Sequence, residues 1–372
     1  MDKKHKVMVP NYEHSIINVS STIVQYYGAH SQYAKIPILE TKLNMHKKHI
    51  VLVLLDGMGT NILNQHLLPT DFLRKHQVDT ITSVYPPTTV AATNAVLAVK
   101  SPYETGYLGW VQYFKEEDTN CVVFLNHDFY DSNRKFDVLL RDKYLSYETI
   151  YEKITKASPY TKTYELFPSF RPTGYPTFEA QLEALSSIIN KDERSFTYVY
   201  WTDPDMTEHD FGITSDETKQ TLRQLNDQLT KFSLTMNDNT IMIIIADHGL
   251  IDVCSIDLFK DLEMNAMLVR KPSIEPRSTN FFVKTGFKLA FKKLFNKRYG
   301  HAFKLYSKKE LINLKLLGRG TMHPKTDACL GDYIAIAFCD SMFNMKEESS
   351  FKAHHAGLTK AEMEVPLIIY HQ

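Results

Sequence analysis

The chain of 372 residues is long enough for one large α/β domain with an insertion, or for two ordinary domains. Hydrophobic residues at 43% and charged residues at 23% are typical of a folded globular protein and exclude a disordered or fibrous chain. Lys+Arg and Asp+Glu both number 43, so no overall field would draw the chain to a nucleic-acid polymer or an anionic membrane.

The cysteines and the amino-terminal segment indicate a compartment. The four cysteines, which lie far apart and form no CxxC pair, are Cys121, Cys254, Cys329 and Cys339. This spacing argues against a disulfide scaffold and a zinc knuckle, and favours a reducing compartment. Pro10 and Glu13 interrupt the amino-terminal stretch before a signal-peptide core develops, and no run approaches the ~18 to 20 apolar residues of a membrane helix. We therefore expect a cytoplasmic protein with no membrane partner.

Three segments are continuous apolar or β-branched runs, as in strands buried on both faces of a sheet. They are Ile50 to Leu55, Phe196 to Trp201 and Thr240 to Ala246. Two further strands are expected near the carboxyl end, at Tyr333 to Phe338 and Val365 to Tyr370. The last carries Pro366, which favours a sheet edge or the start of a strand.

A helix is predicted between the second and third of these strands. Thr214 and Glu217 form a capping-box pattern, and the apolar residues that follow at helical spacing are Leu222, Leu225, Leu229 and Phe232. A right-handed crossover through this helix would make the flanking strands parallel. The prediction is an α/β fold with a mostly parallel central sheet and helices on both faces.

The stretch from 262 to 326 has scattered Gly and Pro and no long buried strand, so we interpret it as a smaller inserted cap or lid. The catalytic core would then comprise residues 1–261 and 327–372. The basic residues of the cap are Lys288, Lys292, Lys293, Lys297 and Arg298, with Arg277, His301 and His323 in the same half of the chain. These groups could meet an anionic substrate, but a solvated surface is the favoured interpretation.

Carboxylates and imidazoles follow the three buried strands, where ligands of open α/β sheets bind. Asp56 begins DGMG, although an Asp that caps a tight turn explains this motif equally well. Asp205 and His209 are four residues apart, a spacing that puts both on one side of a helical turn. Asp247 and His248 follow a strand so apolar that an unpaired charge there would be costly, and a metal ion would compensate it.

Two adjacent histidines, His354 and His355, precede Ala356 and Gly357. In an extended segment their side chains point to opposite faces, so one of the two is a candidate ligand of a given ion. The whole set of carboxylates and imidazoles is a sensible inventory for two divalent ions, most naturally zinc.

The segment SVYPPTTVAATNAVLAV supplies a nucleophile. Two prolines forbid helix, and Thr88 and Thr89 then open an Ala-rich segment that can be helical up to Val99. A Thr at a helix amino terminus lies beside free N–H groups that can hold a phosphate. The alternative is that either Thr is an N-cap alone.

With these residues assembled, the chain resembles the alkaline phosphatase superfamily, and within it the type I phosphodiesterase and nucleotide pyrophosphatase family. The segments that carry the resemblance occur in the family's order and are LLDGMG, YPPTTVAATNAVLAVKSPYETGYLGW, YWTDPDMTEHDFG, IIIADHGL and HAGLTKAEMEVPLI. Five motifs in order over most of the chain are a strong signal.

The resemblance implies a role for each candidate residue. It assigns one zinc to Asp56, Asp247 and His248 together with the nucleophile, and the other to Asp205, His209 and His355. It favours Thr89 over Thr88 as the nucleophile and His355 over His354 as the ligand.

One departure concerns the substrate. Where the family carries an Asn that binds a phosphate oxygen, this sequence has Trp110, and Asn126 is the candidate substitute. Both are therefore candidate substrate-binding residues.

The resulting hypothesis is a two-metal hydrolase of phosphate esters, a phosphodiesterase or nucleotide pyrophosphatase that acts through a phosphothreonine. Its partner would be a small phosphorylated substrate such as a nucleotide, and manganese is the alternative to zinc. The rival enzymes on the same scaffold are a phosphomonoesterase, a phosphonate hydrolase and a sulfatase, although sulfatases use a modified Cys or Ser and neither stands at Thr89. A catalytically silent metal-binding module is the rival of another class, and no expected ligand is missing.

Overall fold

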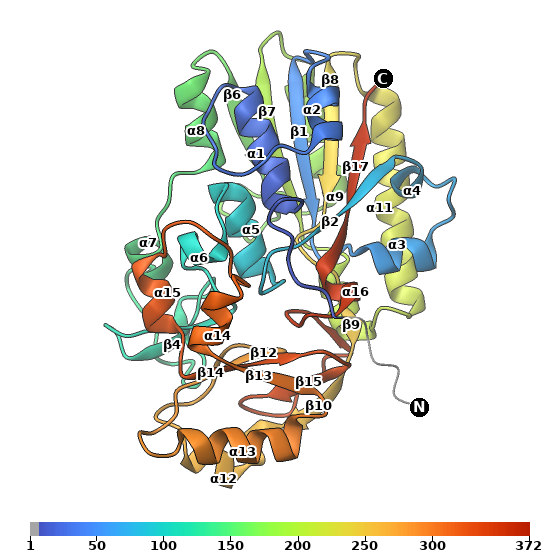
Figure 1. The fold of residues 1–372 in the computed structure, drawn as a ribbon. Coiled ribbons are helices and arrows are strands. Elements are labelled where there is room, and N and C mark those ends of the chain that lie inside the picture. Colours follow the sequence, from blue (N-terminus) through green and yellow to red (C-terminus); the bar gives the residue numbers. More distant parts are fainter. Residues whose placement is uncertain (1–6) are drawn as a thin grey trace.

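Two sheets organise the protein, each in its own lobe, and Figure 1 shows the larger lobe above the smaller one. This computed structural model describes residues 7–372, so residues 1–6 of the predicted core lie outside the described residues. A six-stranded sheet forms the upper lobe and a seven-stranded sheet the lower. Two short strand pairs join β9, Ile251–Asp252, to β16, Ala353–His354, and β10, Cys254–Asp257, to β15, Ser341–Asn344.

The upper sheet is mostly parallel. Its strands, in spatial order, are β2 (Gln77–Thr82), β17 (Glu364–Tyr370), β8 (Thr240–Ile245), β1 (His49–Leu55), β7 (Ser195–Trp201) and β6 (Lys162–Leu166). Strand β1 pairs in parallel with both β7 and β8, and β6 is parallel to β7, whereas β17 is antiparallel to its neighbours. The carboxyl ends of β8, β1 and β7 therefore meet at one edge, above the lower lobe.

Helices flank this sheet in two groups (Figure 1). One group of mutually packed helices is α1 (Ile16–Tyr26), α2 (Pro37–Leu43), α5 (Thr89–Ala98) and α8 (Ile150–Ala157). The other is α3 (Thr60–His66), α4 (Phe72–Lys75), α9 (Phe178–Ile189), α10 (Asp205–Phe211) and α11 (Asp216–Thr235). Short helices α6 (Pro102–Thr105), α7 (Leu140–Tyr144) and α16 (Lys360–Met363) lie toward the junction of the lobes. This arrangement confirms the predicted α/β class.

The expected elements of the core are present, with two local differences. The apolar face predicted for α11 is buried, but its N-cap is Ser215, whose Oγ accepts a hydrogen bond from Thr218 N at 3.1 Å, one residue beyond the expected Thr214. Of the two alternatives for Pro366, the sheet edge is excluded because β17 lies between β2 and β8, whereas the start of a strand holds. Pro366 sits near the start of that strand, where it faces Thr80 of the true edge strand β2.

The lower sheet draws on distant segments of the chain. Its strands, in spatial order, are β13 (Phe303–Ser307), β14 (Tyr333–Ala337), β12 (Ser278–Phe281), β11 (Ser273–Glu275), β3 (Val111–Phe114), β4 (Thr119–Val122) and β5 (His127–Asp128). Helices around it are α12 (Leu262–Ala266), α13 (Lys288–Tyr299), α14 (Lys308–Asn313) and α15 (Pro324–Cys329), with the 3-10 turn Leu258–Lys260. The expected cap, 262–326, supplies β11, β12 and β13, and the other four strands come from outside it. The lower sheet therefore contains strands from both sides of the predicted boundaries at residues 262 and 326. A lid function of residues 262–326 stays a prediction.

A fully buried ion pair ties the lower sheet to the segment that ends in β17. Arg277 Nε lies 2.7 Å from Glu362 Oε1, and Nη2 lies 2.8 Å from Oε2. Glu362 also accepts hydrogen bonds from Gly357 N at 2.6 Å and Thr359 N at 3.1 Å, so it holds the turn after His355. Arg277 was grouped with a basic surface, and that expectation was wrong because its guanidinium has no exposed surface.

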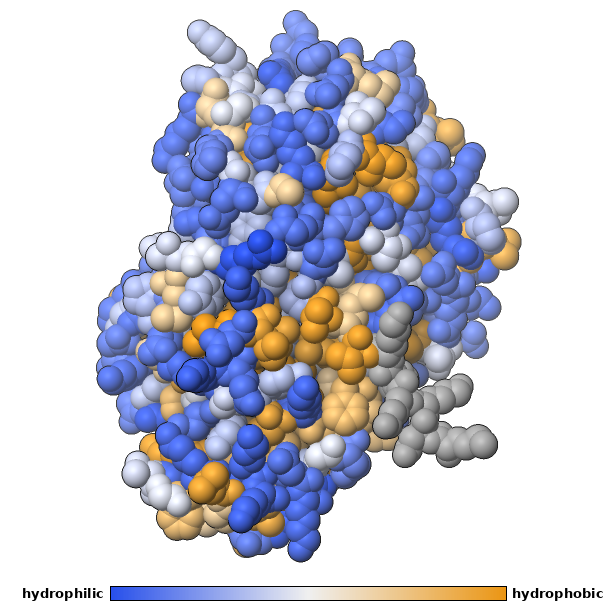
Figure 2. All heavy atoms as spheres, viewed as in Figure 1, coloured by the Kyte–Doolittle hydropathy of each residue, from blue (hydrophilic) through white to orange (hydrophobic). Residues whose placement is uncertain are grey.

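The surface is that of an ordinary globular protein on the face drawn in Figure 2, where hydrophilic residues predominate and hydrophobic ones gather near the junction of the lobes. Within residues 7–372, no helix is both long and apolar enough to cross a membrane.

We predict that Glu362→Gln lowers the free energy of unfolding by about 3 to 5 kcal/mol, because it leaves the Arg277 charge buried without its partner. Denaturant titration followed by tryptophan fluorescence measures this change. The control is Glu40→Gln in the solvent-exposed pair with Lys35, where we expect a change below about 1 kcal/mol. Equal changes in both variants would contradict the special role of the buried pair.

Candidate functional site

Three carboxylates meet where the central strands end. Asp56 follows β1, Asp205 begins α10 after β7, and Asp247 follows β8. Backbone hydrogen bonds fix the meeting, since Asp205 N donates to Asp56 O at 3.1 Å and Gly57 N donates to Asp247 Oδ1 at 3.1 Å. Gly57 has φ +73°, and a Cβ there would lie 2.8 Å from Asp205 Cα, so a side chain is excluded at this close approach.

The first cluster contains Asp56, Asp247, His248 and the hydroxyl of Thr89. His248 Nε2 lies 3.4 Å from both Asp56 Oδ1 and Asp247 Oδ2. Thr89 Oγ1 lies 3.3 Å from Asp56 Oδ1 and 3.3 Å from His248 Nε2. Ligand atoms of Asp56, Asp247 and His248 all lie within 4.8 Å of one another, close enough to bind one ion.

The second cluster is centred on Asp205. Its Oδ1 lies 3.4 Å from His209 Nε2 and 3.9 Å from His355 Nε2. The His209 ring is oriented through its Nδ1, which lies 2.8 Å from Ala353 O. The His248 and His355 rings are 4.0 Å apart between centroids, and His248 also groups with Asp205 and His355 within 4.8 Å, so the two clusters adjoin.

The burial of these groups destabilises their charged forms. Burial raises the pKa of Asp56 well above its usual range, and the nearby carboxylates of Asp247 and Asp205 raise it further. Burial also raises the pKa of Asp205 and of Asp247, while the neighbouring histidine opposes each of these shifts. Burial lowers the pKa of His248 and, further, that of His355, so both imidazoles are neutral and able to act as ligands near pH 7.

The donor set fits divalent cations. In the described chain, the ion pairs of Asp56, Asp205 and Asp247 involve histidines and no lysine or arginine. Asp205 Oδ1 and Asp247 Oδ2 are buried and have no hydrogen-bond partner. Buried carboxylates without a basic partner need a positive charge nearby to be stable in their ionised form. A set of mixed oxygen and nitrogen ligands suits zinc or manganese.

The structure separates the two threonines. Thr88 is the N-cap of α5, and its Oγ1 donates to Glu275 Oε1 at 2.6 Å rather than to a carboxylate of either cluster. Thr89 is the first residue of α5, and its hydroxyl is the one that faces Asp56 and His248. The pattern of a helix start could not decide between them, because both threonines fit it, whereas the family resemblance favoured Thr89.

The two adjacent histidines are separated in a similar way. His355 faces Asp205, whereas His354 Nδ1 accepts a hydrogen bond from His355 N at 2.9 Å. The His354 ring packs against His209, with centroids 4.9 Å apart. His355 therefore presents its Nε2 toward Asp205, whereas His354 packs against the His209 ring.

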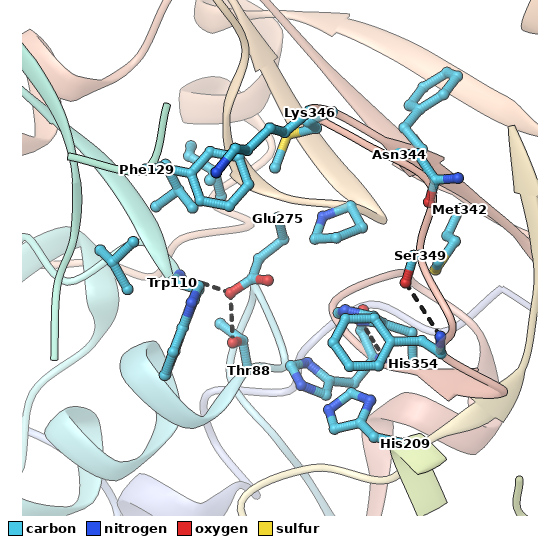
Figure 3. Close-up of a pocket in the computed structure, with 18 of the residues that line it drawn as sticks. Thr88, Trp110, Phe129, His209, Glu275, Met342, Asn344, Lys346, Ser349 and His354 are labelled. Atoms are coloured by element: carbon cyan, nitrogen blue, oxygen red, sulfur yellow. Dashed lines mark hydrogen bonds between the residues drawn. The ribbon is translucent and has the colours of Figure 1, made fainter. Parts of the chain in front are cut away.

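A cavity of about 580 Å³ is lined by Thr89 of the first cluster, by the residues of the second cluster and by residues of the lower sheet. Figure 3 shows Glu275 pointing into it between Trp110 and Thr88, with Phe129 and Lys346 on another side. Its further lining includes Thr89, Asp205, His209, Met342, Asn344, Met345, His354 and His355. A cavity of this volume accommodates a small molecule.

The two candidate substrate-binding residues differ. Trp110 lines the cavity, is 37% exposed, and stays a candidate. Asn126 Nδ2 donates to Phe136 O at 2.8 Å, and its Oδ1 accepts from Leu140 N at 2.9 Å. The Asn126 amide thus holds its own loop, and a role of Asn126 in substrate binding stays a prediction.

Two further residues were missed by sequence reasoning. Tyr200, inside β7, donates its hydroxyl hydrogen to Asp56 Oδ2. Glu275, at the end of β11, is buried, and burial raises its pKa to about 7. A tyrosine in an apolar strand and a lone Glu give no sequence signal; only the sheet pairings bring them to the site.

Comparisons with known proteins agree on one architecture. Residues 50–316 match the family model described as type I phosphodiesterase / nucleotide pyrophosphatase. A search of curated protein sequences gives no significant match. Human ectonucleotide pyrophosphatase / phosphodiesterase 5 is 15% identical over 87% of both chains, with a TM-score of 0.64.

Two complexes are similar to the same degree. The inactive murine ectonucleotide pyrophosphatase / phosphodiesterase 5 with AMP is 14% identical over 87% of both chains, with a TM-score of 0.63. Phosphonoacetate hydrolase from Sinorhizobium meliloti 1021 with phosphonoformate is 14% identical over 88% of this chain and 91% of that one, with a TM-score of 0.62. These structures share the fold of this chain.

We predict that zinc raises the melting temperature, because a cation that binds only the folded protein stabilises it by mass action. Asp205→Asn should lose part of this shift and part of the bound zinc, measured by differential scanning fluorimetry and by mass spectrometry of metal content. Asp210→Asn, an exposed carboxylate on the same helix, is the control and should behave as the wild type. Equal zinc binding by both variants would exclude Asp205 as a ligand.

Proposed function

Because this chain belongs to the type I phosphodiesterase / nucleotide pyrophosphatase family, we propose that it hydrolyses a phosphodiester or pyrophosphate bond in a small substrate. The family match bears out the resemblance seen in the sequence, and family membership supports a phosphoester hydrolase. AMP bound to one similar structure supports a nucleotide as the substrate class.

The observation that carries the proposal is the position of the Thr89 hydroxyl, 3.3 Å from both a buried carboxylate oxygen and a buried imidazole nitrogen. Thr89 begins α5, so backbone N–H groups without acceptors in the helix lie beside its hydroxyl and can hold phosphoryl oxygens. This arrangement supports a nucleophile beside an anion site in the cavity.

In the proposed reaction, Thr89 Oγ1 forms a bond to phosphorus while the bond from phosphorus to the leaving oxygen breaks. The Thr89 proton passes to solvent and the departing oxygen takes up a proton from solvent, so no net charge is created and the product is a phosphothreonine. Water then cleaves the phosphothreonine and restores the hydroxyl. Phosphoryl transfer needs chiefly positioning and charge neutralisation, which the α5 amino terminus and the fixed Thr89 side chain favour.

We assign one divalent cation to Asp56, Asp247, His248 and Thr89, and the other to Asp205, His209 and His355. Bound there, zinc or manganese would neutralise charge on the phosphoryl oxygens and make the Thr89 hydroxyl more acidic. Tyr200 orients Asp56 and the Ala353 carbonyl orients His209, which supports a preorganised set of ligands.

Two other functions fit the same scaffold. A phosphonate hydrolase is favoured by the likeness to phosphonoacetate hydrolase, and a phosphomonoesterase would use the same nucleophile. A silent binding module is disfavoured, since the predicted ligands and Thr89 all meet beside one open cavity.

We predict that bis(4-nitrophenyl) phosphate is hydrolysed with a kcat/KM at least about tenfold above that of 4-nitrophenyl phosphate when zinc or manganese is present. Release of nitrophenol, followed by absorbance, measures both reactions. Hydrolysis of the monoester alone would overturn the diesterase assignment.

We predict that Thr89→Ala lowers kcat by at least about 10³-fold because the variant lacks the nucleophile, while its zinc content stays near that of the wild type. Thr89→Ser, which keeps a hydroxyl, is the control and should retain measurable turnover. A near-normal rate in Thr89→Ala would remove Thr89 from the mechanism.

A further inference from the structure

The Glu275 carboxylate is held in the cavity at a fixed position. Its Oε1 accepts hydrogen bonds from Thr88 Oγ1 at 2.6 Å and from Trp110 N at 2.7 Å. A Cβ on Gly109 would lie 3.2 Å from Glu275 Cγ, so the neighbouring backbone packs tightly on the side chain. The position of this carboxylate is therefore set by packing and by two donors.

One carboxylate oxygen faces the substrate space. Figure 3 shows both hydrogen bonds on Oε1 and none on Oε2, while the side chain extends into the cavity. Its partner Thr88 is next to Thr89, and Asp205 on the facing cluster is close enough to raise the pKa of Glu275. Glu275 thus lies beside the place where Thr89 would meet a phosphoryl group.

The charge of Glu275 has no local compensation. In the part of the chain that the structure describes, it forms no ion pair with lysine, arginine or histidine, and Lys346 is the one lysine or arginine that lines the cavity. Lys346 Nζ lies 4.0 Å from Glu347 Oε1 and over the Phe129 ring, on another side of the cavity from Glu275.

We propose that Glu275 is a specificity-determining residue that selects singly charged phosphate esters over doubly charged ones. The inference rests on the proposed function. A diester carries one negative charge, whereas a monoester carries about two above its second pKa of ~6. A fixed carboxylate beside the phosphoryl position repels the second charge, and a low-polarity, buried setting strengthens that repulsion.

A purely structural role of Glu275 predicts a different result. If Glu275 only held Thr88 and Trp110 in place, its loss would affect every ester equally. Glutamine keeps an oxygen that accepts both hydrogen bonds, and it removes the charge with little change in volume. Glu275→Gln therefore tests the charge separately from the hydrogen bonds.

The experiment compares 4-nitrophenyl phosphate with bis(4-nitrophenyl) phosphate at pH 8 on the zinc-loaded protein. Glu275→Gln should raise the ratio of monoester to diester kcat/KM by about tenfold, which is about 1.4 kcal/mol. Glu275→Asp keeps the charge and should keep the wild-type preference. Glu263→Gln on α12, outside the cavity in the same lobe, removes one charge and should leave the ratio unchanged.

A binding measurement separates this inference from the proposed function. Calorimetry with phenyl phosphate and diphenyl phosphate gives the same ratio from affinities, without turnover. If the wild type binds both ligands but cleaves neither ester, the proposed function fails. The ratio of the two affinities then still tests whether Glu275 disfavours the doubly charged ligand. The inference would be overturned if the monoester-to-diester ratio of Glu275→Gln, in affinity or in kcat/KM, stayed within about twofold of the wild-type ratio.

Discussion

The structure depends on negative charge concentrated at one edge of a parallel sheet. Strands β8, β1 and β7 are neighbours that run in the same direction, so the carboxylates that follow them converge, and all three are buried. No lysine or arginine in the described residues neutralises them, and burial pushes their pKa values upward. Such an arrangement is costly to fold without a cation, which gives the metal assignment its physical basis.

The lower lobe completes the site by long-range contacts. The turn that carries His355 is held by Glu362, which is itself held by Arg277 of the lower sheet. Two residues before Arg277, Glu275 reaches back to Thr88 and Trp110. The short segment from Glu275, the last residue of β11, to Arg277 therefore joins the start of α5, the cavity wall and the His355 turn, so the two lobes are interdependent at the site.

The sequence predicts a residue's role when the pattern that indicates it is local, and fails when the role depends on a partner far away in the chain. Asp56, Asp247 and Thr89 stand next to strong local patterns, a buried strand or a proline-limited helix start, and the structure brings them together as expected. Pro366 was compatible with a sheet edge or with the start of a strand, and only the order of the strands in the sheet excludes the edge. The substrate role of Asn126 stays a prediction, since its amide bonds the backbone of its own loop. Glu275, Tyr200 and Arg277 act through partners 85 to 187 positions away, and no local pattern encodes such a pairing.

Charge balance connects these features to the choice of substrate. With two divalent cations bound, three carboxylates and neutral imidazoles would leave the clusters with a single positive charge, and an ionised Glu275 would cancel it. A singly charged ester would then enter a nearly neutral cavity, whereas a doubly charged one would bring an excess of negative charge beside the N-terminus of α5. The apolar residues that line the same cavity, such as Trp110, Phe129 and Met342, suit the second ester group that distinguishes a diester. The charge and the lining of the cavity thus favour the same class of substrate for separate physical reasons.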